Sequence, residues 1–232
     1  MKPTVVLVHG AFAESASWNG VIEKLGDVDV VAVANPLRSL DGDAAYVRDV
    51  IAGIGGPVLL VGHSYGGMVI TEAAAGNDAV AGLVYVCAFA PEQGESAFAL
   101  STKFPGSTLG EALNAYPVSS GGNEFAIRSD VFRHQFAADV PAAQAAIMAA
   151  TQRPVTEAAL AAGLSTGVPA WKSIPSWFVF SDEDLNIPVA LHRFMAERAG
   201  AKTVREVRGG SHALSVSQPG AVSEVIRDAL GA

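Results

Sequence analysis

The sequence predicts an α/β protein with a doubly wound, mainly parallel six-stranded sheet flanked by helices. Short β-branched apolar runs alternate with longer helical stretches, which is the pattern of βαβ units. Most of these runs are apolar at nearly every position, as in strands that are buried on both faces of a parallel sheet. The length of 232 residues, 50% of them hydrophobic, suits one hydrophobic core.

The composition excludes several classes of protein. The formal net charge of −8 argues against nucleic acid or an anionic membrane as a partner. A single cysteine excludes a disulfide framework, and the longest apolar runs fall far short of the roughly 20 residues that span a bilayer. The chain begins with a strand-like run and not with a signal-peptide segment. We therefore expect a cytoplasmic protein with a small uncharged ligand; the oligomeric state is not indicated.

Strands and helices can be assigned along most of the chain. We expect strands at residues 4–8, 28–34, 57–62, 81–87, 176–180 and 203–207. We expect helices at residues 18–25, 43–54, 66–75, 189–199 and 219–230. Pro188 and Pro219 stand where two of these helices would begin, and Gly200 stands where one would end.

Residues 92–175 interrupt this alternation with a segment far longer than a simple crossover needs. We expect a hairpin with strands at 115–118 and 124–127 around a turn at 119–123, followed by helices at 141–150 and 156–162. The segment leaves the carboxyl end of a strand, where such sheets bind ligands. We therefore interpret 92–175 as a cap over an active site and 1–91 with 176–232 as the core. A peripheral elaboration is the alternative.

The most informative motif is Gly62-His63-Ser64-Tyr65-Gly66, a G-x-S-x-G between a buried strand and an apolar helix. A strand that turns abruptly into a helix strains the backbone of the middle residue. The flanking chain then comes so close that only glycine fits. Such a turn lifts the serine hydroxyl clear of the sheet. We interpret Ser64 as a nucleophile; a glycine-rich turn with an incidental serine is the alternative.

A serine hydroxyl needs a neighbouring base to take its proton. His212 lies between the last strand and the last helix, at the same edge of the sheet as Ser64, and we assign it as the base. The other histidines are His9 after the first strand, His63 inside the turn with its side chain expected to point away from Ser64, His134 in the insertion and His192 on a predicted surface helix.

The base in turn needs a carboxylate that holds its tautomer and stabilises the imidazolium. Asp182, Glu183 and Asp184 all follow the strand at 176–180, again at the same edge of the sheet. Spacing alone does not separate these three acids. The chain order Ser…Asp…His is one of the known orders of such a triad.

Together these motifs resemble the α/β-hydrolase fold along essentially the whole chain. The resemblance is carried by Val8-His9-Gly10-Ala11, the turn at residues 62–67, the spacing from Asp184 to Pro188, and Gly210-Ser211-His212. In that superfamily the acid commonly stands four residues before a proline that opens the next helix, which implies Asp184. The resemblance also implies an oxyanion hole formed by the backbone N–H groups of Ala11 and Tyr65, and a structural role for His9.

Within this fold the chain looks most like the plant methyl esterases and hydroxynitrile lyases and their bacterial relatives. Those proteins share an early His-Gly-Ala followed by a tryptophan, which residues 9–11 and Trp18 match loosely. The lyases typically carry threonine after the first histidine and lysine directly after the catalytic histidine. This chain has Gly10 and Ala213 there. The missing lysine, which would stabilise a cyanide leaving group, favours ester hydrolysis over cyanohydrin cleavage.

Five side chains are candidates for substrate binding. Phe12 follows the oxyanion loop and Phe89 follows the fourth strand, so both should reach the site. Leu185 and Leu214 flank the acid and the base, and Met148 lies on the alanine-rich cap helix.

No cofactor and no metal are expected, because the sequence contains no H-E-x-x-H, no Cys/His cluster and no nucleotide fingerprint. Cys87, in a predicted buried strand, is interpreted as a small apolar filler. Trp171 is interpreted as a core residue near the amino-terminal end of the sheet.

The predicted function is a serine esterase that cleaves small uncharged carboxylic esters through Ser64, His212 and Asp184 and an acyl-enzyme. A lyase or C–C hydrolase on the same triad is one alternative. A catalytically weak ligand-binding receptor of the same fold is another, and a cofactor-free oxygenase of this fold is only weakly excluded. Substrate identity stays open.

Overall fold

The computed structural model describes residues 2–119 and 121–231, and it confirms the predicted sheet. All six strands are parallel and lie in the order β2-β1-β3-β4-β8-β9. Their bounds are β1 Thr4–Val8, β2 Val30–Val33, β3 Val58–His63, β4 Val80–Val86, β8 Ser176–Ser181 and β9 Thr203–Val207. The strand order reverses between β1 and β3, and ligands of such sheets bind beyond the carboxyl ends at this switch point.

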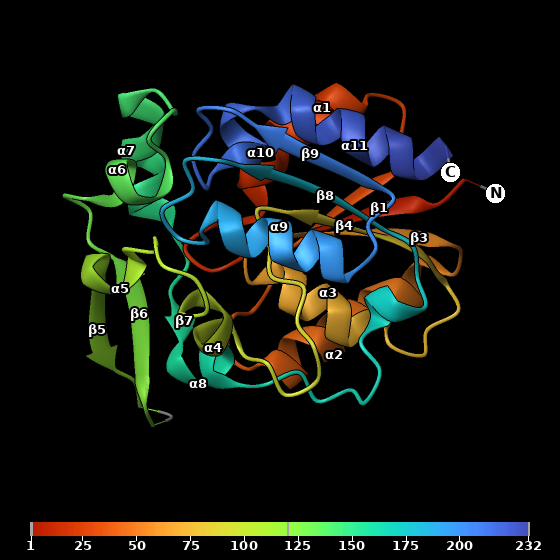
Figure 1. Cartoon of the computed structure of the whole chain (residues 1–232), viewed down its shortest axis with the longest axis horizontal. Coiled ribbons are helices and arrows are strands. Elements are labelled where there is room, and N and C mark those ends of the chain that lie inside the picture. Colours follow the sequence, from red (N-terminus) through yellow and green to blue (C-terminus); the bar gives the residue numbers. More distant parts are fainter. Residues whose placement is uncertain (1, 120, 232) are drawn as a thin grey trace.

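Helices cover both faces of the sheet. Figure 1 shows α1 and α11 on one side of it and α2, α3 and α9 on the other. The helices of the core are η1 Ser15–Trp18, α1 Asn19–Leu25, α2 Leu40–Ile54, α3 Gly66–Ala74, α9 Val189–Arg198, α10 Leu214–Ser217 and α11 Pro219–Gly231. Helix α2 begins earlier than predicted because the Ser39 hydroxyl caps it by accepting a hydrogen bond from Gly42 N–H. The four-residue α10 was not predicted.

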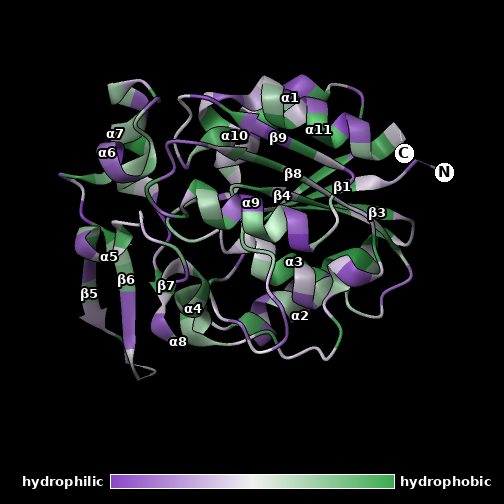
Figure 2. Cartoon of the chain, viewed as in Figure 1, coloured by the Kyte–Doolittle hydropathy of each residue, from purple (hydrophilic) through white to green (hydrophobic). Residues whose placement is uncertain are grey.

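The core is deepest around β3 and α3, in which every residue is buried. Figure 2 shows the central strands as the most hydrophobic part of the sheet. The outer strands β2 and β9 are only partly buried, and every second residue of β9 is exposed. The continuous apolar pattern therefore holds for the central strands and fades at the edges, where solvent reaches the sheet.

The insertion between β4 and β8 forms a separate group of short elements at one end of the sheet (Figure 1, green). They are α4 Ala97–Ser101, α5 Leu109–Ala112, β5 Leu113–Pro117, β6 Asn123–Ile127, α6 Phe132–Phe136, α7 Ala142–Thr151, β7 Val155–Thr156 and α8 Glu157–Ala161. The last element of the insertion, η2 Ala170–Lys172, lies apart from this group, beside α3. The predicted hairpin is confirmed as the antiparallel pair β5 and β6, and β7 adds an unpredicted third strand.

The hairpin turn uses glycine for its backbone geometry. Gly121 and Gly122 have φ angles of 93° and 77°, and Gly121 N–H donates to Val118 O over 2.9 Å. Ser120, which the predicted turn includes, lies outside the described residues, as do the terminal Met1 and Ala232. Within the described parts of the chain, no helix combines the length and the hydropathy that a membrane span requires.

Candidate active site

Ser64 occupies the abrupt turn from β3 into α3, with a φ of 55° in the left-handed region. Its amide donates to Val86 O over 3.2 Å, and the residue is 7% exposed. A Cβ at Gly62 would lie 2.6 Å from Gly66 O, and a Cβ at Gly66 would collide with Val8 O. The turn thus has the strained serine and the obligatory glycines that the motif predicts.

A cavity of about 600 Å³ lies against Ser64. Core residues that line it are Ala11, Phe12, Ser64, Tyr65, Phe89, Asn186 and Ile187. The insertion supplies most of the remaining wall, including Ala97, Phe98, Phe104, Leu109, Leu113 and Leu160. Glu111 is the one acidic side chain in this lining, which contains no lysine, arginine or histidine among the described residues. The cavity is therefore mainly apolar, and it suits an uncharged ligand.

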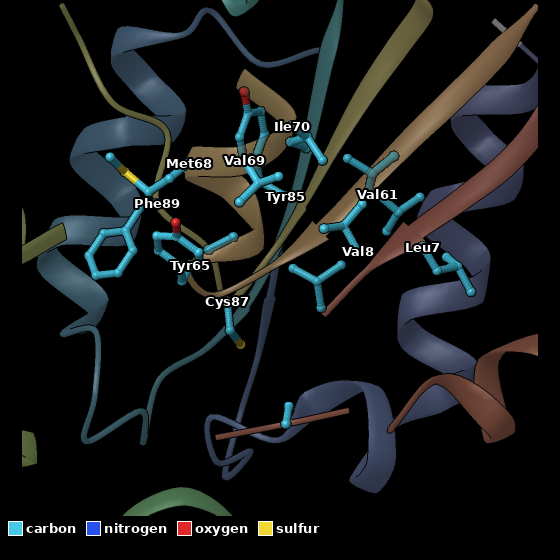
Figure 3. Close-up of a cluster of buried hydrophobic side chains, with 14 of the residues drawn as sticks. Leu7, Val8, Val61, Tyr65, Met68, Val69, Ile70, Tyr85, Cys87 and Phe89 are labelled. Atoms are coloured by element: carbon cyan, nitrogen blue, oxygen red, sulfur yellow. The ribbon is translucent and has the colours of Figure 1, made fainter. Parts of the chain in front are cut away.

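The loop after β1, which carries Ala11, passes close to the amide of Tyr65. A Cβ at Gly10 would lie 2.7 Å from Ser64 Cβ and 3.0 Å from Tyr65 N, so this loop passes directly beside the turn. Tyr65 immediately precedes α3, where backbone N–H groups lack helical partners. Figure 3 shows Tyr65 and Phe89 near the end of β3, and both residues line the cavity.

The side chain of Tyr65 is held in place by a hydrogen bond to a residue of α2. Its hydroxyl donates to Asp43 Oδ2 over 3.0 Å, and both residues are buried. Burial raises the pKa of Tyr65, so the phenol stays protonated and keeps donating. The bond fixes the residue whose amide is one of the two predicted oxyanion donors.

His212 and Asp184 form a buried hydrogen-bonded pair. His212 Nδ1–H donates to Asp184 Oδ2 over 2.7 Å. His212 Nε2 is buried and has no hydrogen-bond partner among the described residues, so this nitrogen is free to accept a proton. His63 Nε2–H donates to His212 O over 2.9 Å, which ties the base loop to the residue before Ser64. The loops that carry the three predicted triad residues thus lie together at one edge of the sheet.

Both oxygens of Asp184 are fully engaged. Oδ1 accepts the amides of Asn186 and Ile187 over 2.8 and 2.9 Å, and Oδ2 accepts from two histidines. Burial alone would raise the pKa of Asp184, but the charge of His212 and the histidine hydrogen bonds outweigh it and hold the pKa below its ordinary value. Asp184 is therefore an ionised carboxylate, as a triad acid must be.

Asp182, the alternative acid, bonds to a backbone amide. Its Oδ1 accepts the amide of Gly209 over 2.7 Å, which links the loop after β8 to the loop after β9. Glu183 is exposed. Of the three acids that spacing could not separate, the structure joins Asp184 to His212.

His9 and His63 are neutral supports. Burial lowers the pKa of His9 to about 4 and that of His63 to about 3, so both stay uncharged near neutral pH. His9 Nδ1–H donates to Gly10 O over 2.9 Å, and its carbonyl accepts the Asn35 amide over 2.9 Å. Both histidines therefore brace the backbone around the turn.

The helix predicted around His192 is present and has an exposed outer face, but His192 itself does not face solvent. The residue is on α9, but its side chain is fully buried. Its ring stacks on Phe180, with centroids 5.0 Å apart and planes at 10°, and its Nε2–H donates to Asp184 Oδ2 over 3.1 Å. Helix α9 turns this residue inward because it packs against β8, next to the acid loop.

Comparison with protein families agrees with the fold and the geometry described above. A model described as the alpha/beta hydrolase family matches residues 5–225. This chain belongs to the alpha/beta hydrolase family. Over its whole length the hydrolase is 29% identical to the alpha/beta hydrolase nvfD of Aspergillus novofumigatus, of which it covers 98%.

Solved structures share the fold of this hydrolase. Polyneuridine aldehyde esterase superposes with a TM-score of 0.81 at 22% identity, over 98% of this chain and 99% of that chain. The methylesterase MES16 from Arabidopsis superposes with a TM-score of 0.80 at 16% identity, over 99% of each chain. Esterases are thus among the structural neighbours of this hydrolase.

Two of the five predicted pocket residues, Phe12 and Phe89, line the main cavity of the hydrolase. Met148 instead lines a smaller cavity of about 270 Å³, which it shares with Phe12. Leu214 is fully buried, and Leu185 does not line either cavity; its carbonyl accepts a hydrogen bond from the insertion. Adjacency to the triad in sequence did not predict which way these side chains face.

Sequence reasoning also missed Asn186 and Ile187, which line the main cavity, and the insertion residues around it. The short helices α4 and α5, which contribute part of this wall, contain five and four residues. Such lengths are too short to establish a helical period, so no local signal could have identified the cavity wall.

The insertion also contacts both triad loops of the hydrolase. Gln135 Nε2–H donates to Leu185 O over 3.0 Å and to Asn186 Oδ1 over 2.8 Å, on the acid loop. Phe136 packs edge-on against the His212 ring, with centroids 5.0 Å apart. The segment around α6 therefore contacts the loops of the predicted acid and base, although it does not line the main cavity.

Asp139, another residue of the insertion, contacts the loop that carries His212. Ser211 Oγ–H donates to Asp139 Oδ1, and Ala213 N–H donates to Phe136 O over 2.9 Å. These bonds lie on either side of His212. The loop that carries the base is thus fixed from the insertion as well as from the sheet.

Cys87, His192 and Asp184 form a buried group whose potential metal-binding atoms lie within 4.8 Å of one another. Cys87 directly follows β4 with a φ of 42° and is fully buried. Burial raises the pKa of its thiol, which therefore stays protonated, and the Asp184 oxygens already accept four hydrogen bonds. This donor set fits support of the carboxylate better than metal binding. Trp171 is buried as predicted, with its Nε1–H donating to Pro91 O over 2.8 Å.

Proposed function

We propose that this hydrolase is a serine esterase that cleaves uncharged carboxylic esters through an acyl-enzyme. The observation that carries the proposal is the strained Ser64 at the cavity wall together with the buried pair of His212 and Asp184. The esterase names of the structural neighbours support it. No other reaction is needed to account for a serine, a free imidazole nitrogen and an ionised carboxylate in one place.

In the first half-reaction, His212 Nε2 takes the hydroxyl proton of Ser64 while Oγ bonds to the ester carbonyl carbon. The negative charge that develops on the carbonyl oxygen is stabilised by the N–H groups of Ala11 and Tyr65. The bond from the carbonyl carbon to the alkoxy oxygen then breaks, and the His212 imidazolium gives its proton to the leaving alcohol.

In the second half-reaction, a water molecule loses a proton to His212 Nε2 as it attacks the acyl carbon. The same two amides hold the oxyanion, and the proton returns to Ser64 Oγ as the acid product leaves. Asp184 stays ionised throughout, because its role is to hold the Nδ1–H tautomer and to stabilise the imidazolium.

The cavity supports an uncharged and largely apolar substrate. Its volume of about 600 Å³ and its aromatic lining, with Phe12, Phe89 and Phe98, suit an ester with a substantial apolar group. The net charge of −8 adds mild repulsion of the carboxylate product. Ala213, directly after the base, supplies no ammonium for a cyanide leaving group, which further favours hydrolysis over cyanohydrin cleavage.

The insertion, in this proposal, is the cap of the active site. It supplies most of the cavity wall around the serine, and it bonds to both triad loops. Its shape therefore sets which acyl and alcohol groups fit, while the core supplies the chemistry.

A fluorophosphonate probe tests the nucleophile, because it labels a serine only where a base activates the hydroxyl. We expect the wild-type protein to be labelled and to turn over short-chain p-nitrophenyl esters. Ser64→Ala should lose both properties while keeping its circular dichroism spectrum. Ser173→Ala, a matched change in a turn next to η2, should keep both.

Two results would overturn the proposal. Absence of labelling in folded wild-type protein would exclude an activated serine. Labelling with a single slow acylation and no turnover would favour the ligand-binding receptor instead. A panel of esters that varies acyl length and alcohol bulk then defines the substrate.

A further inference from the structure

Asp184 is held by two histidines, not one. Oδ2 accepts His212 Nδ1–H at 2.7 Å and His192 Nε2–H at 3.1 Å, and all three side chains are buried. The mechanism uses only the first of these bonds. A second imidazole on the same carboxylate oxygen therefore needs its own explanation.

The protonation state of His192 follows from its surroundings. Burial lowers the pKa of His192, so its ring is neutral and carries one proton. Asp184 Oδ2 can only accept, which places that proton on Nε2. His192 Nδ1 is buried and has no partner among the described residues. The ring is thus fixed as a neutral donor whose one hydrogen bond goes to the triad carboxylate.

The packing of His192 directs this donor. The ring lies parallel to Phe180 with centroids 5.0 Å apart, and Phe180 belongs to β8, the strand that leads into the acid loop. The strand and helix that flank the acid loop therefore set the position of the donor relative to Asp184. A histidine that only filled the core would not need the triad acid as its hydrogen-bond partner.

We propose that His192 is a positioning residue of this site, which orients the Asp184 carboxylate and moderates its pull on the proton of His212. The inference rests on the proposed esterase function. A carboxylate oxygen that accepts a second N–H is a weaker acceptor for the first. The His212 imidazolium is then stabilised enough to form but not so strongly that it fails to release its proton to the alcohol.

Several titratable groups lie around the pair of His212 and Asp184 and their loops, and only those that change protonation can contribute to the pH profile. They are His63 on β3, Cys87 after β4, Asp139 after α6, Asp184 after β8 and His192 on α9. Burial holds the pKa of His63 at about 3 and raises that of Cys87. Neither of these two groups therefore adds a step to the acid limb of kcat/KM near neutral pH.

The test compares His192→Phe, which keeps a stacking ring but removes the donor, with His192→Gln, which keeps an N–H donor. For His192→Phe we expect a loss of about tenfold in kcat with little change in KM, the size expected for one hydrogen bond to a charged group. The acid limb of kcat/KM should move to higher pH by about half a unit to one unit. His192→Gln should restore most of kcat and the wild-type acid limb.

Phe180→Leu is the matched packing control. It removes the stacking partner but leaves the donor, so it should lower the melting temperature and leave the acid limb in place. His192→Leu repeats the donor deletion in case the extra atoms of phenylalanine disturb the core. Folded donor-deletion variants with wild-type kcat and an unshifted acid limb would overturn the proposal, as would an equal effect of His192→Gln and His192→Phe.

Proton NMR separates this inference from the proposed function, because it needs no turnover. The hydrogen-bonded Nδ1–H of His212 should give a far-downfield signal, which moves further downfield in His192→Phe as Asp184 becomes a stronger acceptor. An unchanged His212 signal would overturn the role of His192 even in an active enzyme. A shifted signal in a protein without esterase activity would keep the role and reject the esterase.

Discussion

The two sides of the candidate site are held by different kinds of contact. Around Ser64, the nucleophile side, the decisive contacts are made by backbone atoms. Around Asp184 and His212, the acid–base side, they are made mainly by side chains. Gly10, Gly62 and Gly66 have no space for a Cβ because neighbouring backbone passes within contact distance. Asp184 and His212 are instead held by a side-chain hydrogen bond to each other, and His192 on α9 also donates to Asp184. Side chains of the insertion, Gln135 and Asp139, bond to the neighbouring residues Asn186 and Ser211. The two sides therefore respond differently to substitution.

This difference separates the contacts that stabilise the fold from those that tune the chemistry. A backbone contact that admits only glycine is part of the close packing of β1, β3 and α3, so its loss should disturb folding. A side-chain hydrogen bond to a loop can be removed while the sheet remains intact. Changes on the acid–base side should therefore reduce turnover in proteins that still fold.

The largest effect is expected at the acid. Asp184→Asn presents an amide that cannot accept from the two histidines and from the Asn186 and Ile187 amides at once. It also favours the wrong tautomer of His212, so kcat should fall by about 10⁴-fold. Asp182→Asn keeps the oxygen that accepts Gly209 N–H, and it should change kcat by less than about threefold. Ester kinetics of the two variants decide between the acids. A severe loss only in Asp182→Asn would reverse the assignment.

The next effect concerns folding on the nucleophile side. Gly66→Ala places a methyl group against Val8 O, and we expect it to destabilise the protein by more than about 3 kcal/mol or to prevent folding. Gly53→Ala, in an exposed part of α2 with open space around it, should stabilise by up to about 1 kcal/mol. Urea unfolding measures the free energy of unfolding of both variants. Similar stability of the two variants would contradict the role of backbone contact.

The smallest effect tests the insertion. Gln135→Leu removes the two hydrogen bonds to the acid loop, and we expect about a tenfold loss of kcat. Gln144→Leu, on the exposed surface of α7, should keep the wild-type kcat. Comparing kcat of the variants at the same folded fraction separates an effect on the position of the acid loop from an effect on the stability of the protein. Equal kcat values for Gln135→Leu and the wild type would show that the core alone holds the acid loop.

Much of the core and of the geometry of the candidate site could be predicted because the decisive signals are local. The glycines around Ser64 reflect a turn only five residues long, and parallel strands bring their carboxyl ends to one edge whatever their separation in the chain. His212 was predicted on that ground alone. The choice of Asp184 over Asp182 needed the family resemblance, because both follow the same strand.

The rest depends on tertiary contacts that leave no local pattern. His192 lies among residues of a surface-like helix, and only its packing against Phe180 and the acid loop buries it. Gln135 reaches Asn186 across a long separation in sequence. The cavity wall comes from elements too short to show a period. The cytoplasmic location stays a prediction.

The hydrogen bonds of Gln135 and Asp139 have a consequence for evolution and for engineering. The insertion shares bonds with the loops that carry the acid and the base, so it is not an interchangeable module on a fixed catalytic core. A graft of this segment onto a relative keeps these side-chain bonds only if matching residues at 186 and 211 travel with it. New specificities in this lineage must therefore arise by paired changes in the segment and the loops.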